Sequence, residues 1–150
     1  MKNVNIVTDR NIGLDKRKLH SLIQDVQKKE KFSISNLQVN ILNAEYVLEL
    51  NKKYLEHDYN TDILTFNYSE SSDNLDGEIF ISFQDALGNA LKFNVNLDNE
   101  ILRLIIHGIL HLLGYDDQNA DDKKMMASKE DNLVDTFQSK YENIVIKYDS

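Results

Sequence analysis

The sequence predicts one α/β domain (α+β mixed) over residues 1–150, with one roughly four-stranded mixed sheet packed against about five helices. Three observations support this fold class. The chain has 150 residues, of which 41% are hydrophobic and 28% charged, as expected for one globular domain with a sizeable core. Segments with strand and helix periodicity follow one another in mixed order. The chain contains no internal repeat, low-complexity block or linker that would divide it.

The first part of the chain is expected to form two strands separated by a helix, followed by a second helix. Short β-branched or alternating runs predict the strands, at 4–7 and about 36–42. Apolar residues at helical spacing predict the first helix over 15–29, with Asp15 as its N-cap. The second helix follows Asn43, its expected cap, and its apolar face carries Val47, Leu50 and Tyr54.

The second part is expected to begin with a hairpin. Residues 63–68 and 78–82 have strand composition, and the polar segment 69–77, which ends in Asp76-Gly77, is typical of a hairpin loop. Three helices are then expected, over 83 to about 92, 97–113 and 121–140. Ser82 with Asp85 resembles a capping box, and Asn96 can cap the middle helix. The tail at 144–146 fits either a short strand or a packed end.

Composition narrows the classes of function. The chain has no cysteine, so metal ligands must come from His, Asp, Glu or the backbone. Its N-terminus lacks an apolar segment of signal-peptide length, and the most apolar run, 101–113, is interrupted by Arg103 and two histidines. We therefore expect a soluble, cytoplasmic protein with no membrane contact. The formal net charge of −8 by itself argues against nucleic acid, although local basic pairs such as Lys52-Lys53 could form a basic stripe.

Residues 107–117 have the spacing of a zinc site. His107 and His111 are four residues apart, so they lie one turn apart on the same face of a helix. Gly114 can end that helix in a left-handed conformation and reverse the chain, which would bring Asp117 to the same ion. Metzincin proteases have ligands at this spacing, so the helix is expected to be a zincin-like metal helix. Asp116 is the alternative third ligand, with Asp117 fitting the spacing better.

The protease general base is absent, because Gly108 stands where those proteases carry Glu. Two His ligands and one carboxylate would leave a fourth zinc position open to water, which is the design of a catalytic site. Zinc would lower the pKa of that water and polarise a carbonyl or phosphoryl oxygen. Arg103, one turn before His107, could grip a phosphate, although an ion pair with Glu100 is the favoured interpretation.

The motif His107-Gly108-Ile109-Leu110-His111-Leu112-Leu113-Gly114-Tyr115-Asp116-Asp117 resembles that of the YbeY family of bacterial endoribonucleases, in which the last position is His. The segments 50–54, 58–66 and 77–81 are also similar to that family. The sequence departs from the family at Asp117, which is itself a competent zinc ligand, and at Leu55, where the family has an arginine assigned to RNA cleavage.

The resemblance implies a single domain with one Zn²⁺ per chain, single-strand RNA cleavage in 16S rRNA maturation and ribosome quality control, and association with the small ribosomal subunit rather than with DNA. The metal ligands would be His107, His111 and Asp117. Asp62 and Glu78 are candidate general bases. Arg103 is a candidate phosphate contact that could substitute for the family's arginine, which is absent because Leu55 stands at that position. Two alternatives remain open: a zinc hydrolase of peptides or amides, and a non-enzymatic ribosome-assembly factor with a structural metal.

Overall fold

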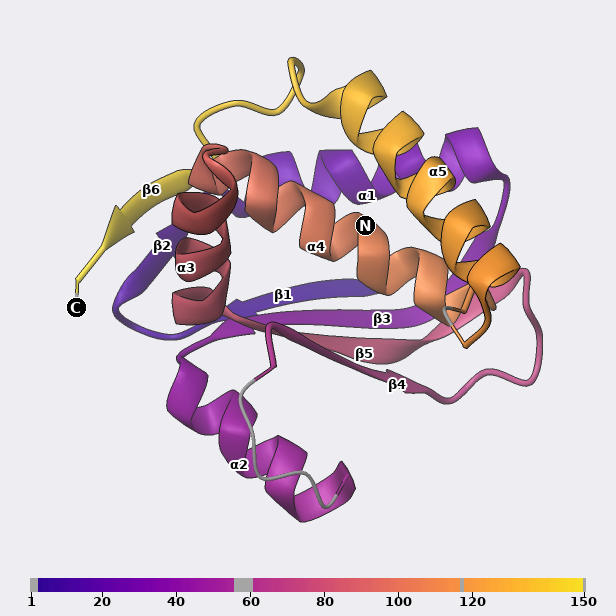
Figure 1. The fold of residues 1–150 in the computed structure, drawn as a ribbon, viewed down its shortest axis with the longest axis horizontal. Helices are drawn as coiled ribbons and strands as arrows, with labels where there is room; N and C mark the ends of the chain where they lie inside the picture. Colours follow the sequence, from indigo (N-terminus) through magenta and orange to yellow (C-terminus); the bar gives the residue numbers. More distant parts are fainter. Residues whose placement is uncertain (1–2, 56–60, 117, 150) are drawn as a thin grey trace.

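A computed structural model describes residues 3–55, 61–116 and 118–149. Its centre is a four-stranded sheet with the order β1-β3-β5-β4 (Figure 1). The first three of these strands are parallel, and β4 pairs antiparallel with β5 at one edge. The four strands are β1 (Val4–Thr8), β3 (Ser33–Leu42), β5 (Asn74–Ser82) and β4 (Ile63–Asn67). The prediction of one mixed four-stranded sheet is thus confirmed.

A second sheet has two strands, β2 (Ile12–Leu14) and β6 (Val145–Tyr148), which pair antiparallel and bring the end of the chain beside its first part. The tail that fitted either a strand or a packed end is therefore a strand. Backbone hydrogen bonds on both sides of this pair fix it, from Asp15 N–H to the carbonyl of Ile144 and from Asp149 N–H to that of Asn11.

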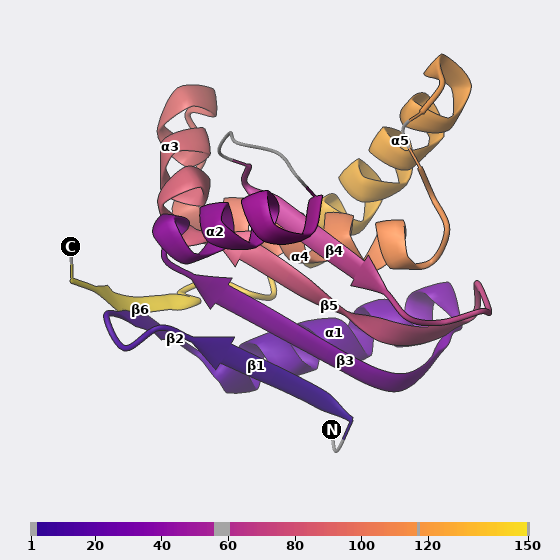
Figure 2. The same cartoon turned by 90° about the horizontal axis from the view of Figure 1, so that it is seen from below.

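The described residues form five helices, as predicted, and these cover the two faces of the main sheet unequally. They are α1 (Lys16–Glu30), α2 (Ala44–Leu55), α3 (Phe83–Phe93), α4 (Leu97–Leu112) and α5 (Ala120–Phe137). Figures 1 and 2 place α1 and α4 on one face and α2 alone on the other. Helix α5 packs on α4 rather than on the sheet. The main core therefore lies between the sheet and α1 and α4, and a smaller cluster lies under α2.

The side chains that were predicted to cap the N-termini of the helices do so, with one exception. The side chains of Asp15, Ser82 and Asn96 accept N-terminal backbone N–H groups of α1, α3 and α4, as predicted. Asn43 precedes α2 but does not cap it. Its side-chain oxygen accepts hydrogen bonds from the amides of Asn11 and Gln84, and Gln84 Oε1 accepts the Ala44 N–H instead. A contact between distant parts of the chain thus replaces the local cap.

The hairpin of β4 and β5 is confirmed, but its predicted loop was too long. The register pairs Gly77 with Asn67, so Asp76-Gly77 lies inside β5 instead of forming the turn. Glycine is required at position 77 because a Cβ there would lie 2.5 Å from the carbonyl oxygen of Phe66. Strand β5 begins earlier than its composition suggested because Asn74 and Asp76 pair with β3. Within the described residues, no helix is both long and apolar enough to cross a membrane.

Candidate metal centre

Helix α4 carries the two histidines of the sequence motif. Asn96 caps its start, and Asp98 and Glu100 lie in its first turn, where carboxylates favour the positive helix end. Most of the helix is buried, but His107 is half-buried and His111 is exposed. The predicted geometry of two imidazoles one turn apart on a helix is therefore present, at the solvent-facing side of a largely buried helix.

The chain reverses after α4 through Gly114, whose φ is +101°. The Gly114 N–H donates to the carbonyl of His111, and the Leu113 and Tyr115 N–H groups donate to that of Leu110. The predicted glycine turn is thus present. Asp117 lies outside the described residues, and the carboxylate of its neighbour Asp116 accepts the Gln118 N–H at 3.2 Å. Among the residues that are described, no three His, Cys, Asp or Glu side chains are grouped to hold a metal ion.

His107 is held from the side by α5. Its Nδ1 atom lies 2.6 Å from Oε1 of Glu130, whose side chain is only 14% exposed. In metal sites, a histidine typically donates one ring N–H to a carboxylate, which fixes the tautomer and leaves the other nitrogen for the metal. The contact with Glu130 meets that requirement through Nδ1. Neutral imidazole is a common zinc ligand, so the two histidines of α4 are compatible with this metal.

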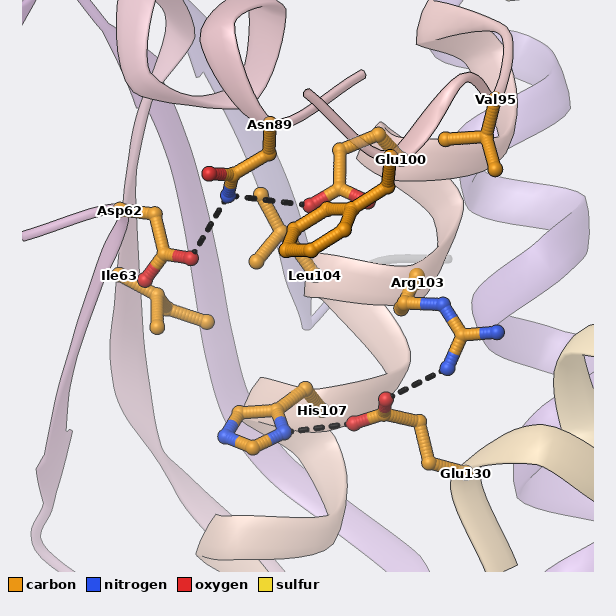
Figure 3. Close-up of a pocket in the computed structure, with 10 residues that line it drawn as sticks. Asp62, Ile63, Asn89, Val95, Glu100, Arg103, Leu104, His107 and Glu130 are labelled. Carbon is orange, nitrogen blue, oxygen red and sulfur yellow. Dashed lines mark hydrogen bonds and ion pairs between the residues drawn. The ribbon is translucent and has the colours of Figure 1, made fainter. Parts of the chain in front are cut away.

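Arg103 does not form the favoured ion pair with Glu100. Its Nη1 atom instead lies 2.7 Å from Oε2 of Glu130 and 2.8 Å from Oδ1 of Asp131. Burial by itself would lower the pKa of Arg103, but these two hydrogen-bonded carboxylates outweigh it and raise the pKa. The interpretation failed because the sequence could not show that α5 lies beside this face of α4. Figure 3 shows Glu130 joined to both Arg103 and His107.

A pocket of about 490 Å³ opens beside His107, between α3, α4, α5 and the start of β4. Asp62, Arg103 and His107 all line it, so the structure brings together three of the predicted site residues. On the wall formed by α3, Asn89 Nδ2 donates to Oδ2 of Asp62 at 3.0 Å and to Oε2 of Glu100 at 3.2 Å (Figure 3). One amide therefore bridges two carboxyl groups that face the same cavity.

Glu100 is a site residue that sequence reasoning missed. From the sequence its side chain was expected only as an ion-pair partner of Arg103, yet it is 6% exposed and lines the pocket. Burial raises its pKa, the Asn89 hydrogen bond opposes that shift, and the negative charge of Asp62 adds to it. Glu130 was missed as well, because nothing in the acidic α5 sequence marks one carboxylate among several. The sequence did contain a signal for Glu100. It lies one turn before Leu104 and two turns before His107, and therefore on the same face of α4 as the histidine.

Gly108 is explained by close packing. A Cβ at this position would lie 2.8 Å from Cδ1 of Ile79 on β5, well inside normal contact. A side chain at this position would therefore force the side chain of Ile79 to shift. The missing protease base at position 108 is thus a consequence of how this helix packs, because a glutamate there would have to enter the core.

Glu78 lies away from the other predicted site residues. Along β5, Gly77, Ile79 and Ile81 are buried, and Glu78 and Phe80 alternate with them. Glu78 and Phe80 line a second pocket with Tyr46 and Tyr54 of α2. The sheet therefore separates the Glu78 carboxylate from the pocket that contains His107.

The chain was compared with known proteins. The family described as "Endoribonuclease YbeY" matches residues 4–138. A protein of that name from Cytophaga hutchinsonii is 40% identical over 113 residues, covering 75% of this chain and 79% of the relative. One from Karelsulcia muelleri is 41% identical over 116 residues, covering 77% and 81%.

A similar solved structure is the solution structure of a Thermotoga maritima protein, which is 28% identical with a TM-score of 0.68 and covers 91% of this chain and 90% of that one. It has the same overall fold at a sequence identity well below that of the curated relatives. The family match over residues 4–138 includes β4, α4 and α5 in full, and therefore both α4 histidines and the pocket beside His107. The chain belongs to the YbeY endoribonuclease family.

Proposed function

We propose that this protein is a zinc-dependent endoribonuclease that cleaves single-stranded RNA. The observation that carries the proposal is the family match over residues 4–138, which includes both α4 histidines and the pocket beside His107. The pocket supplies chemistry suited to hydrolysis: an imidazole, two carboxyl groups bridged by an amide, and a guanidinium. An open pocket of this kind can admit a phosphodiester together with water.

We assign His107, His111 and Asp117 as the ligands of one Zn²⁺. The support is the hydrogen bond from His107 to Glu130, the spacing of one turn to His111, and the Gly114 reversal that leads towards Asp117. Bound zinc would polarise the scissile phosphate and lower the pKa of a water molecule. Glu130 accepts the hydrogen bond from Nδ1 of the neutral His107 ring and holds the ring in place, and α5 is thereby part of the site.

Asp62 is the carboxylate in the pocket that we assign to accept a proton during hydrolysis. Asn89 orients it through Oδ2, leaving the other carboxylate oxygen to meet water. Glu78 is the other candidate from the sequence, but it faces the opposite side of the sheet and is better suited to contacts outside the cleavage step.

We propose that Arg103 contacts the phosphate while it keeps its ion pairs with Glu130 and Asp131. Both of its ion pairs are made through Nη1, and a guanidinium has five N–H donors in all. The side chain is 35% exposed and lines the pocket. A phosphate entering the pocket could therefore meet the remaining donors without breaking the contacts to Glu130 and Asp131.

We further propose that the RNA acted on is rRNA, in maturation and quality control of the small ribosomal subunit in the cytoplasm. This assignment rests on the family resemblance. The net charge of −8 means that overall electrostatic attraction to RNA is weak, so binding has to rely on local contacts or on docking to the ribosome.

Chelation tests the proposal directly. Purified protein should cut a labelled single-stranded RNA, lose that activity when zinc is removed, and recover it when zinc is returned, while a duplex of the same sequence is spared. Activity that survives complete metal removal would overturn the metal-dependent mechanism. Absence of cleavage by zinc-loaded protein that still binds small ribosomal subunits would favour the assembly-factor alternative.

A further inference from the structure

Helix α2 lies on the face of the sheet opposite α4 (Figure 2). A groove of about 450 Å³ lies between α2, β4 and β5 on that face. We call it the aromatic groove, because five aromatic side chains line it together with Leu50 and the carboxylate of Glu78: Tyr46, Tyr54, Phe66, Tyr68 and Phe80. It lies on the far side of the sheet from the His107 pocket. None of its residues has a role in the cleavage step proposed above.

The groove combines a fixed floor with exposed rings. Phe66 and Phe80 pack on the small core cluster under α2, and their rings meet edge to face with centroids 5.7 Å apart. Tyr54 stands edge to face on Phe66 at 6.0 Å, yet it is 57% exposed. Tyr68 is similarly exposed, at 58%. Large aromatic rings held in place and open to solvent are suited to stacking against a flat ligand.

A basic side chain lies beside one of the aromatic rings of the groove. Lys52 and Lys53 occupy the last turn of α2, and Lys53 Nζ is 5.3 Å from the centroid of the Tyr54 ring. A ring face next to an ammonium group is complementary to a nucleotide, in which a flat base is attached to a phosphate. In a chain of net charge −8, this pairing of aromatic and basic side chains is a local site for an anionic, aromatic ligand.

Edge strand β4 connects the aromatic groove to the cleavage pocket. Ile63 of β4 lines the His107 pocket and Phe66, three residues further on, lines the groove. At the rise of a β-strand these positions are roughly 10 Å apart along β4. Helix α4 runs beside the same strand, and near its end the carbonyl of Leu112 accepts a hydrogen bond from Asn67. A chain lying across the histidines could therefore pass over the exposed edge of β4 within a few nucleotides.

We propose that the aromatic groove binds a base of the single-stranded RNA substrate, a few nucleotides from the phosphate that is cut. The inference rests on the proposed function and adds a second contact to it. Unpaired bases can splay out and stack on aromatic side chains, whereas bases in a duplex cannot, so the groove would also favour single strands. Tyr54 and Tyr68 supply the stacking surfaces, and Lys53 faces the neighbouring phosphate.

Binding of a non-cleavable RNA tests the groove independently of catalysis. A 2′-O-methyl dodecanucleotide, long enough to span both sites, would be titrated against zinc-loaded wild type and Tyr54→Leu by fluorescence anisotropy. Loss of one base–aromatic stack should weaken binding roughly 5- to 100-fold. Tyr54→Phe keeps the ring and should bind like wild type.

Two further variants complete the test. Tyr68→Leu should weaken dodecanucleotide binding as Tyr54→Leu does, whereas Ile146→Ala, at an exposed apolar side chain on β6, should not. Unchanged dodecanucleotide affinity in both tyrosine variants would overturn the proposal, and so would equal losses in Tyr54→Leu and Tyr54→Phe. If RNA affinity is unchanged but the variants no longer bind ribosomal proteins, the groove is a protein-docking surface. Failure of wild type to cleave RNA while these affinity differences persist would contradict the proposed function and leave the groove intact.

Discussion

The Nδ1 atom of His107 lies 2.6 Å from Oε1 of Glu130, a residue 23 positions later in the chain. The second oxygen of Glu130 lies 2.7 Å from Nη1 of Arg103. A single carboxylate of α5 thus holds two functional side chains of α4, and the geometry of the proposed metal site depends on how these two helices pack. Helix α5 is therefore a structural support of the site, although it supplies none of the proposed ligands.

Removing the Glu130 carboxylate should weaken zinc binding. Loss of a carboxylate that orients a ligating histidine typically lowers metal affinity about 10- to 100-fold. We expect Glu130→Ala to show this loss in competition with a chromogenic chelator, and Glu130→Gln to lie between it and wild type. Asp131→Asn is the matched control, because Asp131 contacts Arg103 but not His107. Wild-type zinc affinity in Glu130→Ala would show that the contact does not support the metal site.

Substitution of Gly108 should destabilise the fold through overpacking. An alanine Cβ would lie 2.8 Å from Cδ1 of Ile79, and forced contacts of this kind cost about 1–3 kcal/mol. Ile79→Val removes that methyl group, so Gly108→Ala with Ile79→Val should lose less stability than the sum of the two single changes. Urea denaturation of the four proteins measures the coupling.

Gly88 provides the control for that prediction. It lies exposed in α3, and an added Cβ there would have no other atom within 4 Å. Gly88→Ala should therefore stabilise the protein by up to about 1 kcal/mol, through helix propensity alone. Equal effects of alanine at positions 88 and 108 would contradict the close approach of α4 to β5.

Ionisation of Glu100 should make stability depend on pH. Burial raises the pKa of this carboxyl group above its ordinary value of 4.5, so the folded protein binds its proton more tightly than the unfolded chain does. Folding is therefore favoured while Glu100 is protonated, and this contribution is lost as the pH rises through the folded-state pKa. Glu100→Gln does not titrate, so its stability relative to wild type should increase from acid towards neutral pH.

Parallel stability curves for wild type and Glu100→Gln, measured by urea denaturation, would show that Glu100 is not perturbed in the folded protein.

The elements that could be predicted from the sequence are those set by neighbouring residues. The periodicity of α4, its Asn96 cap and the Gly114 reversal are local properties, and all three are present. The contacts of Glu130 with His107 and Arg103 depend instead on how α5 packs against α4, which no local pattern encodes. The pairing of Arg103 with Glu100 was wrong for this reason.

The position of Glu78 could have been inferred. Side chains alternate along a strand, so Glu78 had to lie on the opposite face from Ile79. Ile79 is fully buried and is the residue that Gly108 of α4 approaches. A glutamate between two such buried positions points away from the metal helix. The strand assignment alone therefore places Glu78 and Ile79 on opposite faces of the sheet. That α4 is the helix covering the Ile79 face is known only from the three-dimensional structure.

The central claim is that metal held by the α4 histidines is needed for RNA cleavage. The most direct test measures zinc content and cleavage of a labelled single-stranded RNA for wild type and a folded His111→Ala variant, purified in parallel. The account predicts about one zinc per chain and cleavage for wild type, with both lost in the variant. Equal cleavage by the two proteins, or an inactive wild type that is fully loaded with zinc, would contradict it.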